Sequence, residues 1–479
     1  MDLATYAALD GTALAAMVRR GEVTPSDLAA TALRAIEVAN PTIGAVVEAY
    51  AEAARPAAAS GDGHFCGVPF LIKDVGQHFA GRRVEYGSRL CAGMIVAADS
   101  FFGRLVKASG LNPVGRSSTP EFSMALCAEN RLHGSTTNPW RRGTSTGGSS
   151  GGAAAAVAAG LVPVAHGSDM GGSIRGPAAW CGTVGLYPSR GRVSAGPMMG
   201  EGGHGMTQNF VLTRTVRDTA AALDALGVPQ PGDPFVIRRP ERPFADYVTR
   251  PARPLRIAFS AAPLMDAPVD REVAAAVGRV ARVLEDMGHH VEEAAPAIDL
   301  GRIDAACREI WYFGFHRTLD AYATRTGRRV GPDTVERATL RFYTYARAQP
   351  VERFLAALDD LNMVRRSVGP FFQAHDAWLT PTCAQVAQPF GVYGMDIDLS
   401  PEAFLVHEQR PCQFMIANNV SGQPGLSLPL AQHSGGLPIG VQLTARHGEE
   451  EVLIQLGAAL EQAMPWRDRV PPLHVARLG

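Results

Sequence analysis

The apolar positions of this chain follow two alternating patterns from about residue 68 onward. Short, almost wholly apolar runs, which predict buried strands, lie at 68–72, 162–165, 256–260, 378–380 and 440–444. Longer segments that predict helices lie at 100–109, 269–287 and 449–462. With a further strand at 290–293, residues 256–293 form a predicted βαβ unit. Strands that alternate with helices predict an α/β fold with a sheet covered by helices on both faces.

The first sixty residues predict helices at the periphery of the fold. Thr24 is a favourable N-cap residue, and Pro25 suits the first helical position. The helix that follows is expected to stop before Asn40 and Pro41, because a proline cannot donate a backbone hydrogen bond in a helix interior. Residues 51–63 are rich in alanine, glycine and serine and predict a connection.

No internal repeat and no low-complexity linker divides the chain, so we expect one domain over residues 1–479. Its predicted parts are a helical N-terminal arm at 1–60, a catalytic α/β core at 61–300 and 376–479, and a helical insertion at 301–375. The insertion is rich in aromatic residues and arginine, and we expect it to form a cap.

Composition narrows the function classes and the compartment. A net charge of −1 with interspersed acids and bases does not favour nucleic acid or an anionic membrane as a partner. Seven scattered cysteines without a Cys-x-x-Cys pair predict reduced thiols and no zinc site. No signal peptide is evident, and the longest apolar run, at 153–164, is too short to span a bilayer. We therefore expect a cytoplasmic protein.

The candidate chemistry lies in a glycine-rich segment at 143–177, which presents two serines in glycine settings. Ser149 lies in Gly-Gly-Ser-Ser-Gly-Gly, directly before an alanine-rich run that predicts a buried helix. Ser173 follows two glycines, and consecutive glycines allow backbone amides to converge on one point. Such a group of amides beside a hydroxyl can stabilise the oxyanion that forms when the serine attacks a carbonyl.

A base for these serines is expected from Lys73, at the end of the apolar run 68–72. A lysine that is desolvated by apolar neighbours can lose its proton near neutral pH and can then activate a serine. The thirteen histidines show no metal-ligand spacing, and His166 is expected to be a hydrogen-bonded loop histidine. The residues thus predict a Ser-Ser-Lys hydrolase that needs neither a metal nor a cofactor.

The chain resembles the amidase signature family of serine hydrolases over about residues 8–465. Besides residues 67–74, the motifs that carry the resemblance are Gly-Gly-Ser-Ser-Gly-Gly (147–152), Asp-Met-Gly-Gly-Ser-Ile-Arg (169–175), Gly-Thr-Val-Gly-Leu (182–186), Gly-Arg-Val-Ser (191–194), Leu-Thr-Pro-Thr (379–382), Asn-Val-Ser-Gly-Gln-Pro (419–424) and Leu-Pro-Ile-Gly-Val-Gln-Leu (437–443). The resemblance implies a large twisted mixed β-sheet covered by helices on both faces.

The resemblance also implies a role for each matching residue. Ser173 would be the acylated nucleophile, Ser149 a bridging serine held by a cis peptide, and Lys73 the base. The oxyanion would be bound by the backbone amides of Met170, Gly171, Gly172 and Ser173. The supporting residues would be Ser150, Asp169 and Arg175, and we expect Asp169 and Arg175 to be structural. Such an enzyme cleaves the C–N bond of an amide through an acyl-enzyme.

Two other motifs that the glycine-rich segment partly matches do not fit its surroundings. Gly-Gly-Ser-Ser-Gly at 147–151 matches the nucleophile elbow of α/β-hydrolases, but residues 138–143 in front of it predict a loop and not the required strand. A phosphate-binding loop would need a lysine where Ser149 stands. The remaining alternative is an amidotransferase subunit that acts in a multi-subunit complex on charged transfer RNA.

The substrate pocket is expected to draw on three variable stretches, at 121–138, 196–206 and 307–316. The candidate pocket residues are Met124, Met198, Met199, Trp311 and Phe315. Aromatic residues close together in 307–316 are more often cap core, but any that face the site would select a hydrophobic or aryl substrate. Within the family the chain most resembles aryl acylamidases and nylon-oligomer hydrolases. The expected substrate is a small amide or anilide, with esters and carbamates as further candidates, and the expected state is a monomer or homodimer.

Overall fold

The computed structural model describes residues 1–55 and 63–478 of the chain, and its centre is a mixed sheet of eleven strands. In spatial order the strands are β1 (Val46–Ala49), β3 (Asn112–Ser117), β2 (Pro69–Lys73), β6 (Val164–Asp169), β8 (Gln208–Thr213), β7 (Val184–Tyr187), β12 (Gly425–Gln432), β13 (Pro438–Ala445), β11 (Ala377–Pro381), β9 (Arg256–Phe259) and β10 (His290–Glu293). The pairings of β2 with β3 and β6 are parallel, whereas the pairings β6–β8, β8–β7, β7–β12 and β12–β13 are antiparallel. The predicted α/β class with a mixed sheet is confirmed.

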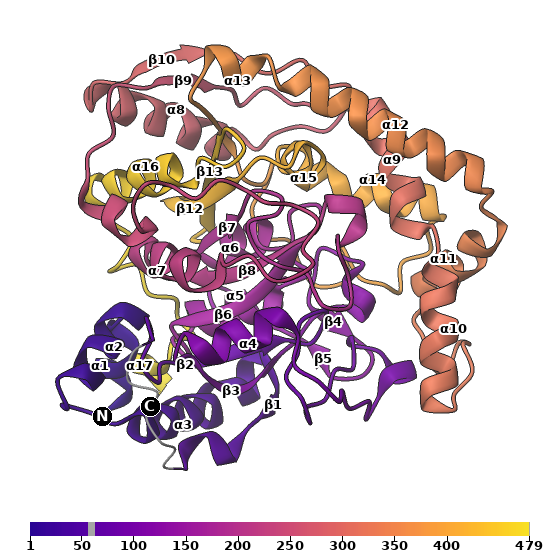
Figure 1. Cartoon of the computed structure of the whole chain (residues 1–479), viewed down its shortest axis with the longest axis horizontal. Coiled ribbons are helices and arrows are strands. Elements are labelled where there is room, and N and C mark those ends of the chain that lie inside the picture. The colour runs from indigo at the N-terminus through magenta and orange to yellow at the C-terminus, as the bar shows by residue number, and fades with distance from the viewer. Residues whose placement is uncertain (56–62, 479) are drawn as a thin grey trace.

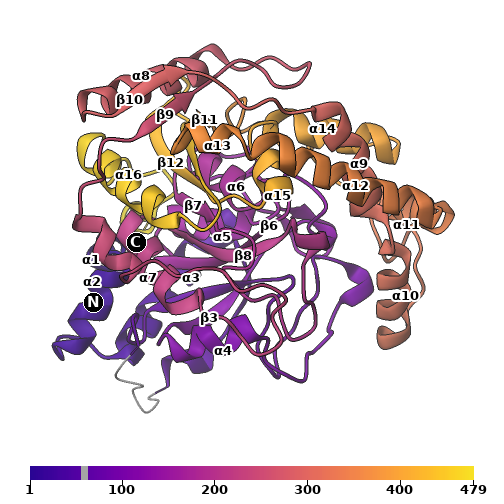
Figure 2. The same ribbon diagram turned by 45° about the horizontal axis from the view of Figure 1, so that its top comes forward.

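Helices lie on both faces of this sheet (Figures 1 and 2). They are α1 (Leu3–Ala8), α2 (Gly11–Arg19), α3 (Pro25–Ile43), α4 (Phe101–Ala108), α5 (Gly151–Ala158), α6 (Arg175–Cys181), α7 (Val216–Leu226), α8 (Arg271–Asp286), α9 (Leu300–Tyr312), α10 (Phe315–Thr326), α11 (Arg337–Ala348), α12 (Val351–Val368), α13 (Phe371–Ala374), α14 (Pro401–Cys412), α15 (Ile416–Ser421), α16 (Glu450–Ala463) and α17 (Val475–Leu478). Among the residues described, no helix is long and apolar enough to cross a membrane.

Two regions flank the sheet at opposite ends of the molecule. Helices α1 to α3, coloured indigo, lie beside the C-terminal helix α17, and helices α9 to α12, in orange, form a group at the other end (Figure 1). Helices α9 and α12 pack against each other along their length. The predicted boundary between the N-terminal arm and the core, at 60/61, lies outside the described residues, as does most of the predicted connection at 51–63.

Predicted strands and helices at 68–72, 100–109 and 256–293 are present as β2, α4 and the parallel β9–α8–β10 unit. The alanine-rich run forms α5, in which all eight residues are buried. Glycine and alanine are required there, because a Cβ on Gly152 would lie 2.5 Å from the backbone nitrogen of Ser118. Small side chains therefore allow α5 to lie directly against the sheet.

Two expectations for the chain ends were wrong. Helix α3 does not stop before Pro41 but continues to Ile43 and ends at Gly44, which adopts a left-handed conformation. Pro41 is tolerated because it lies in the last turn, where the Gly44 amide donates to the Asn40 carbonyl at 2.7 Å. The helix predicted at 449–462 was expected to be the final one and is present as α16, but the short helix α17 follows it.

Candidate active site

Three segments of the sheet and its connections bring the candidate catalytic residues together. Lys73 is the last residue of β2, which pairs in parallel with β6. Ser149 lies in the loop before α5, and the peptide bond between Gly148 and Ser149 is cis. Ser173 lies between the end of β6 and the start of α6. Helices α5 and α6 also pack against each other, so the loops that carry the two serines are neighbours.

The amine of Lys73 is held between two hydroxyl groups. Its Nζ atom lies 2.8 Å from Ser149 Oγ and 2.9 Å from Ser168 Oγ. The side chain is 1% exposed. Within residues 1–55 and 63–478, no carboxylate forms an ion pair with it. The hydrogen-bond partners of the amine are therefore two neutral hydroxyls, each of which can accept or donate a hydrogen bond.

This environment disfavours the charged form of the lysine. Burial lowers the pKa of Lys73 to about 7, and the more distant charge of Asp169 only partly opposes the shift. A substantial fraction of the amine is therefore uncharged near neutral pH. Desolvation at the end of an apolar strand was predicted from the sequence, and the pKa of Lys73 is lowered by that cause.

His166 was expected to be a loop histidine, but it lies within strand β6. It is hydrogen-bonded, as expected: Nδ1 accepts from the Lys73 amide at 3.3 Å, and Nε2 lies 3.3 Å from Asn209 Oδ1. Burial and the neighbouring Lys73 lower the pKa of His166 to about 3. The imidazole is thus neutral, and both of its nitrogens are occupied by structural contacts.

Ser173 differs from Ser149 in its exposure. Ser149 is 2% exposed, whereas Ser173 is only partly buried. The carbonyl of Ser173 accepts a hydrogen bond from the Ser150 amide at 3.2 Å, which ties the two loops together. In the part of the chain that is described, the Ser173 hydroxyl forms no hydrogen bond, either with Ser149 or with another group. Hydrogen bonds between catalytic groups often tighten only when substrate is bound.

A buried ion pair fixes the loop that carries Ser173. Arg175 donates from Nε and Nη2 to the two carboxylate oxygens of Asp169, at 2.9 and 3.0 Å. Asp169 also accepts from the amides of Gly172 and Ile174, and its pKa is lowered because these donors and the Arg175 charge outweigh its burial. Both side chains are fully buried. They position the loop and lie out of reach of a ligand.

The bond to Asp169 changes the expected oxyanion site at one position. The amide of Gly172 already donates to Asp169 Oδ1 at 2.8 Å. Gly172 also has a φ of +124°, and a Cβ there would lie 2.7 Å from Met415 Cε. The glycine is thus required for the turn of the backbone, while the amides of Met170, Gly171 and Ser173 remain available to a ligand.

Sequence reasoning missed several polar groups that complete this site. Ser168 contacts the Lys73 amine from β6, and its own amide bonds with Ser150 Oγ at 3.2 Å. Thr119 donates from Oγ1 to the carbonyl of Ser149 at 2.9 Å. Asn419 donates to Asp169 Oδ1 at 2.8 Å from helix α15. Ser168 could have been found, because it directly precedes Asp169 in a strand that pairs with β2.

The structure separates the candidate pocket residues into two groups. Trp311, on α9, lies over the glycine loop, with two ring atoms 3.2 Å from the position that a Cβ on Gly171 would take. Trp311, Met124 and Phe315 are partly buried members of one hydrophobic cluster. Met198 and Met199 are 80% and 44% exposed, and the structure does not bring them to this cluster.

One group of acidic and imidazole side chains near Lys73 could in principle hold a metal ion. In the described residues it consists of Asp74, Glu85 and His133. Arg116 already occupies its centre, with ion pairs of 2.5 Å to both carboxylates. The guanidinium supplies the positive charge that a metal would bring, so the cluster is explained as an ion-pair network.

Comparison with known proteins identifies the family. The Amidase family model matches residues 27–454. The chain is 34% identical to the 6-aminohexanoate-cyclic-dimer hydrolase of Paenarthrobacter ureafaciens, over 97% of this chain and 96% of that protein. The chain belongs to the amidase signature family. The fold of the chain can therefore be compared with solved structures of related proteins.

Two solved structures resemble this amidase over almost its whole length. A 6-aminohexanoate cyclic dimer hydrolase complexed with substrate superimposes with a TM-score of 0.92 at 34% identity, covering 98% of this chain and 99% of that one. A bacterial aryl acylamidase of the same family superimposes with a TM-score of 0.86 at 26% identity, covering 98% of both chains. The amidase is thus a hydrolase that acts on C–N bonds of amides, as the sequence predicted.

Proposed function

We propose that this amidase cleaves small amides through an acyl-enzyme on Ser173, with Ser149 and Lys73 as the proton relay. The observation that carries the proposal is the 2.8 Å contact between Lys73 Nζ and Ser149 Oγ, in a setting where Lys73 has a pKa of about 7. An uncharged amine in this position can accept the proton of a serine hydroxyl. The partly exposed Ser173 is the hydroxyl that a substrate can reach.

The reaction proceeds in two halves. Ser173 Oγ attacks the amide carbonyl while its proton passes to Ser149 and the Ser149 proton passes to Lys73. The amides of Met170, Gly171 and Ser173 stabilise the oxyanion, each contributing on the order of 3 kcal/mol. Ser149 then returns a proton to the leaving nitrogen, the C–N bond breaks and the amine departs. Water attacks the ester on Ser173 by the same relay and releases the carboxylic acid.

A relay that can both take a proton and return it suits amide cleavage better than a base that can only take one. An amine leaves only when it is protonated, so the group that takes the proton from the nucleophile must also give one to the nitrogen. Three contacts support this role: Ser149 Oγ bonds with Lys73 Nζ, Thr119 holds the Ser149 carbonyl, and the amide of the next residue donates to the Ser173 carbonyl. The fixed orientation supports a role in passing the proton in both directions.

We further propose that the substrate is an apolar amide, with an aryl or medium-length alkyl group beside the scissile bond. Trp311 lies over Gly171, next to the proposed oxyanion site, and supplies a flat apolar surface. Phe122 packs edge-to-face on Phe315, with ring centroids 5.8 Å apart. Such an arrangement supports anilides and lactam-like amides, and allows esters and carbamates as further substrates.

The purified chain alone is expected to hydrolyse 4-nitroacetanilide, because all the proposed groups belong to one polypeptide. A chromogenic panel with an anilide, a primary amide, an ester and a carbamate, followed at pH 8, measures the preference. The Ser173→Ala protein, purified in the same way, gives the background. An amidotransferase subunit would need partner chains, so absence of hydrolysis above background for every compound would contradict the proposal. The close likeness to hydrolases over the whole chain does not favour that alternative.

A further inference from the structure

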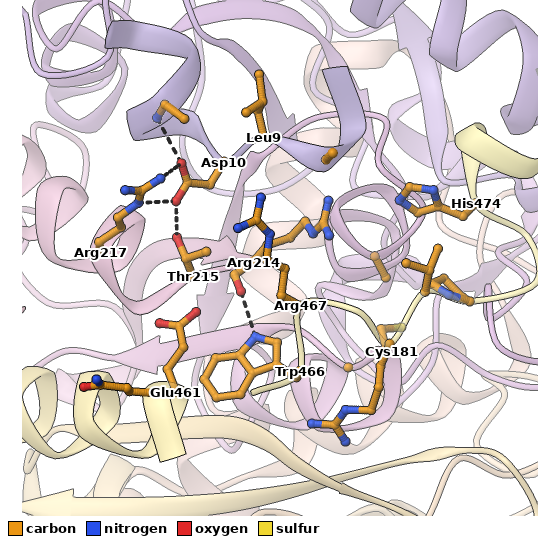
Figure 3. A pocket seen from close by; sticks show the side chains of 18 of the residues that line it. Leu9, Asp10, Cys181, Arg214, Thr215, Arg217, Glu461, Trp466, Arg467 and His474 are labelled. Atoms are coloured by element: carbon orange, nitrogen blue, oxygen red, sulfur yellow. Dashed lines mark hydrogen bonds and ion pairs between the residues drawn. The ribbon is translucent and has the colours of Figure 1, made fainter. Parts of the chain in front are cut away.

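A second cavity lies where the N-terminal arm, helix α7 and the C-terminal segment meet. Its volume is about 350 Å³, within the range of small-molecule sites. It is lined at one side by Asp10 and Arg217, at the other by His474, and between them by Arg214 and Arg467 (Figure 3). None of these residues takes part in the proposed amide cleavage.

The charges around this cavity do not balance. Its lining includes the four arginines Arg214, Arg217, Arg467 and Arg469 but only the two carboxyl groups of Asp10 and Glu461. The negative charge of Asp10 is already paired, because Arg217 Nε and Nη2 donate to its two carboxylate oxygens at 2.5 and 2.6 Å. Burial raises the pKa of Glu461 to about 7, so this carboxyl supplies less than a full negative charge at neutral pH.

Three arginines therefore face the cavity without an acidic partner. Within the described chain, Arg214, Arg467 and Arg469 form no ion pair, and Arg214 and Arg469 donate only to the carbonyls of Ala7 and Pro429. Burial lowers the pKa of Arg214, the nearby charge of Arg467 adds to this effect, and the charges of Asp10 and Asp218 only partly oppose it. Two like charges near each other in a partly desolvated site would be stabilised by an anion between them.

His474 supplies an unpaired donor in the same wall. The side chain is 3% exposed, and its Nδ1 accepts from the Ala476 amide at 3.3 Å, which places the ring proton on Nε2. In the described chain Nε2 has no hydrogen-bond partner. Burial lowers the pKa of His474 to about 4, so the ring is a neutral donor. Nε2 lies against Gly160, where an added Cβ would be only 2.7 Å from it, so this donor stays unpaired in a tightly packed part of the wall and is not assigned to the ligand.

Much of the remaining wall is apolar, although Thr215 and Gln462 also line it. Both indole N–H groups at the cavity are already used: Trp466 donates to the Arg214 carbonyl at 2.9 Å and Trp140 to the Cys181 carbonyl at 2.7 Å. Their rings, with Leu9, therefore present hydrocarbon surface. We propose that this cavity binds a small organic carboxylate, with the carboxylate between Arg214 and Arg467 and the apolar body against Trp466.

This site is separate from the amide-cleaving site. Ala158 and Cys181, at the cavity, are the last residues of α5 and α6. The loops that carry Ser149 and Ser173 stand at the opposite ends of these two helices. A helix the length of α5 spans about 12 Å. The proposal concerns an additional ligand site and does not depend on the mechanism proposed above.

Titration calorimetry with sodium hexanoate on the full chain tests the proposal. We expect saturable binding, and a dissociation constant raised about tenfold or more by Arg467→Glu. Arg467 is exposed and its side chain donates to no other described group, so its replacement leaves the fold intact. Arg282→Glu, at an exposed position of α8, makes the same change in net charge away from the cavity and should leave the dissociation constant unchanged.

A second variant and two further ligands make the test specific. Arg214→Gln should weaken hexanoate to a similar degree in protein whose melting temperature shows that it is folded. Hexan-1-ol, which lacks the charge, and inorganic phosphate, which lacks the apolar body, should each bind at least tenfold more weakly. Equal affinity of hexanoate for wild type and both cavity variants would place it elsewhere, for instance at Ser173, and would overturn the proposal. Equal binding of either comparison ligand would also overturn it.

Discussion

Replacing Ser173 by alanine removes hydrolysis of 4-nitroacetanilide, with kcat falling by about 10⁵-fold or more, the scale seen when a serine nucleophile is deleted. The reason is that, among the residues the structure describes, no other hydroxyl is both accessible to a substrate and beside the amides of the glycine loop. Ser149 is 2% exposed, and its oxygen is bonded to Lys73. The measurement is the initial rate at saturating anilide, with the melting temperature recorded for both proteins.

A matched serine and a trapped intermediate sharpen this prediction. Ser367→Ala, at an exposed position of α12 whose hydroxyl bonds only within its own helix, should leave the rate unchanged. Brief reaction with 4-nitrophenyl hexanoate should add one acyl group to the peptide that holds Ser173. An acyl group on Ser149, together with activity in Ser173→Ala, would instead favour the elbow-type arrangement in which Ser149 is the nucleophile.

The second large effect is expected for Lys73→Met, which keeps the length of the side chain but cannot accept a proton. We expect kcat/KM on the anilide to fall by about 10⁴-fold, the upper range for loss of general base catalysis. The chain contains only two lysines, Lys73 and Lys107. Lys107 forms an ion pair with Asp99 at the surface and gives a matched control, because Lys107→Met should retain the wild-type rate.

The size of the loss distinguishes the base from a structural lysine. If the side chain of Lys73 only filled the space between its strand and the serine loops, methionine would fill that space equally well and most activity would survive. A Lys73→Met rate above one tenth of wild type at pH 7 would therefore contradict the relay. The same protein should still be folded, because removing a buried polar group whose partners are hydroxyls leaves no charge unpaired.

The positions of the candidate catalytic residues could be predicted because these residues lie close in sequence to glycine-rich turns or to an apolar run. The two serines each precede a helix, and Lys73 ends an apolar run, so local patterns gave their positions. The βαβ unit of β9, α8 and β10 was equally clear, since its parts are adjacent in the chain. The prediction of Lys73 as the base rested on desolvation, and the structure supplies that burial.

Features built from distant segments could not be predicted in the same way. Asn419 reaches Asp169 from α15, and the carboxyl of Asp169 takes the Gly172 amide that was assigned to the oxyanion site. The passage of α3 through Pro41 depends on Gly44 at the helix end. The second cavity joins residues from both ends of the chain. Each depends on tertiary contacts that no local pattern of residues records.

The most direct test of the account is the ionisation of the Lys73 amine in the folded protein. Because the chain holds two lysines, protein labelled with ¹³C at the lysine ε-carbon should give two signals, and the one missing from Lys73→Met belongs to Lys73. We predict that this signal titrates with a midpoint near pH 7. A Lys73 signal that stays at the position of a charged ammonium up to pH 9 would contradict the claim that an uncharged lysine drives the reaction.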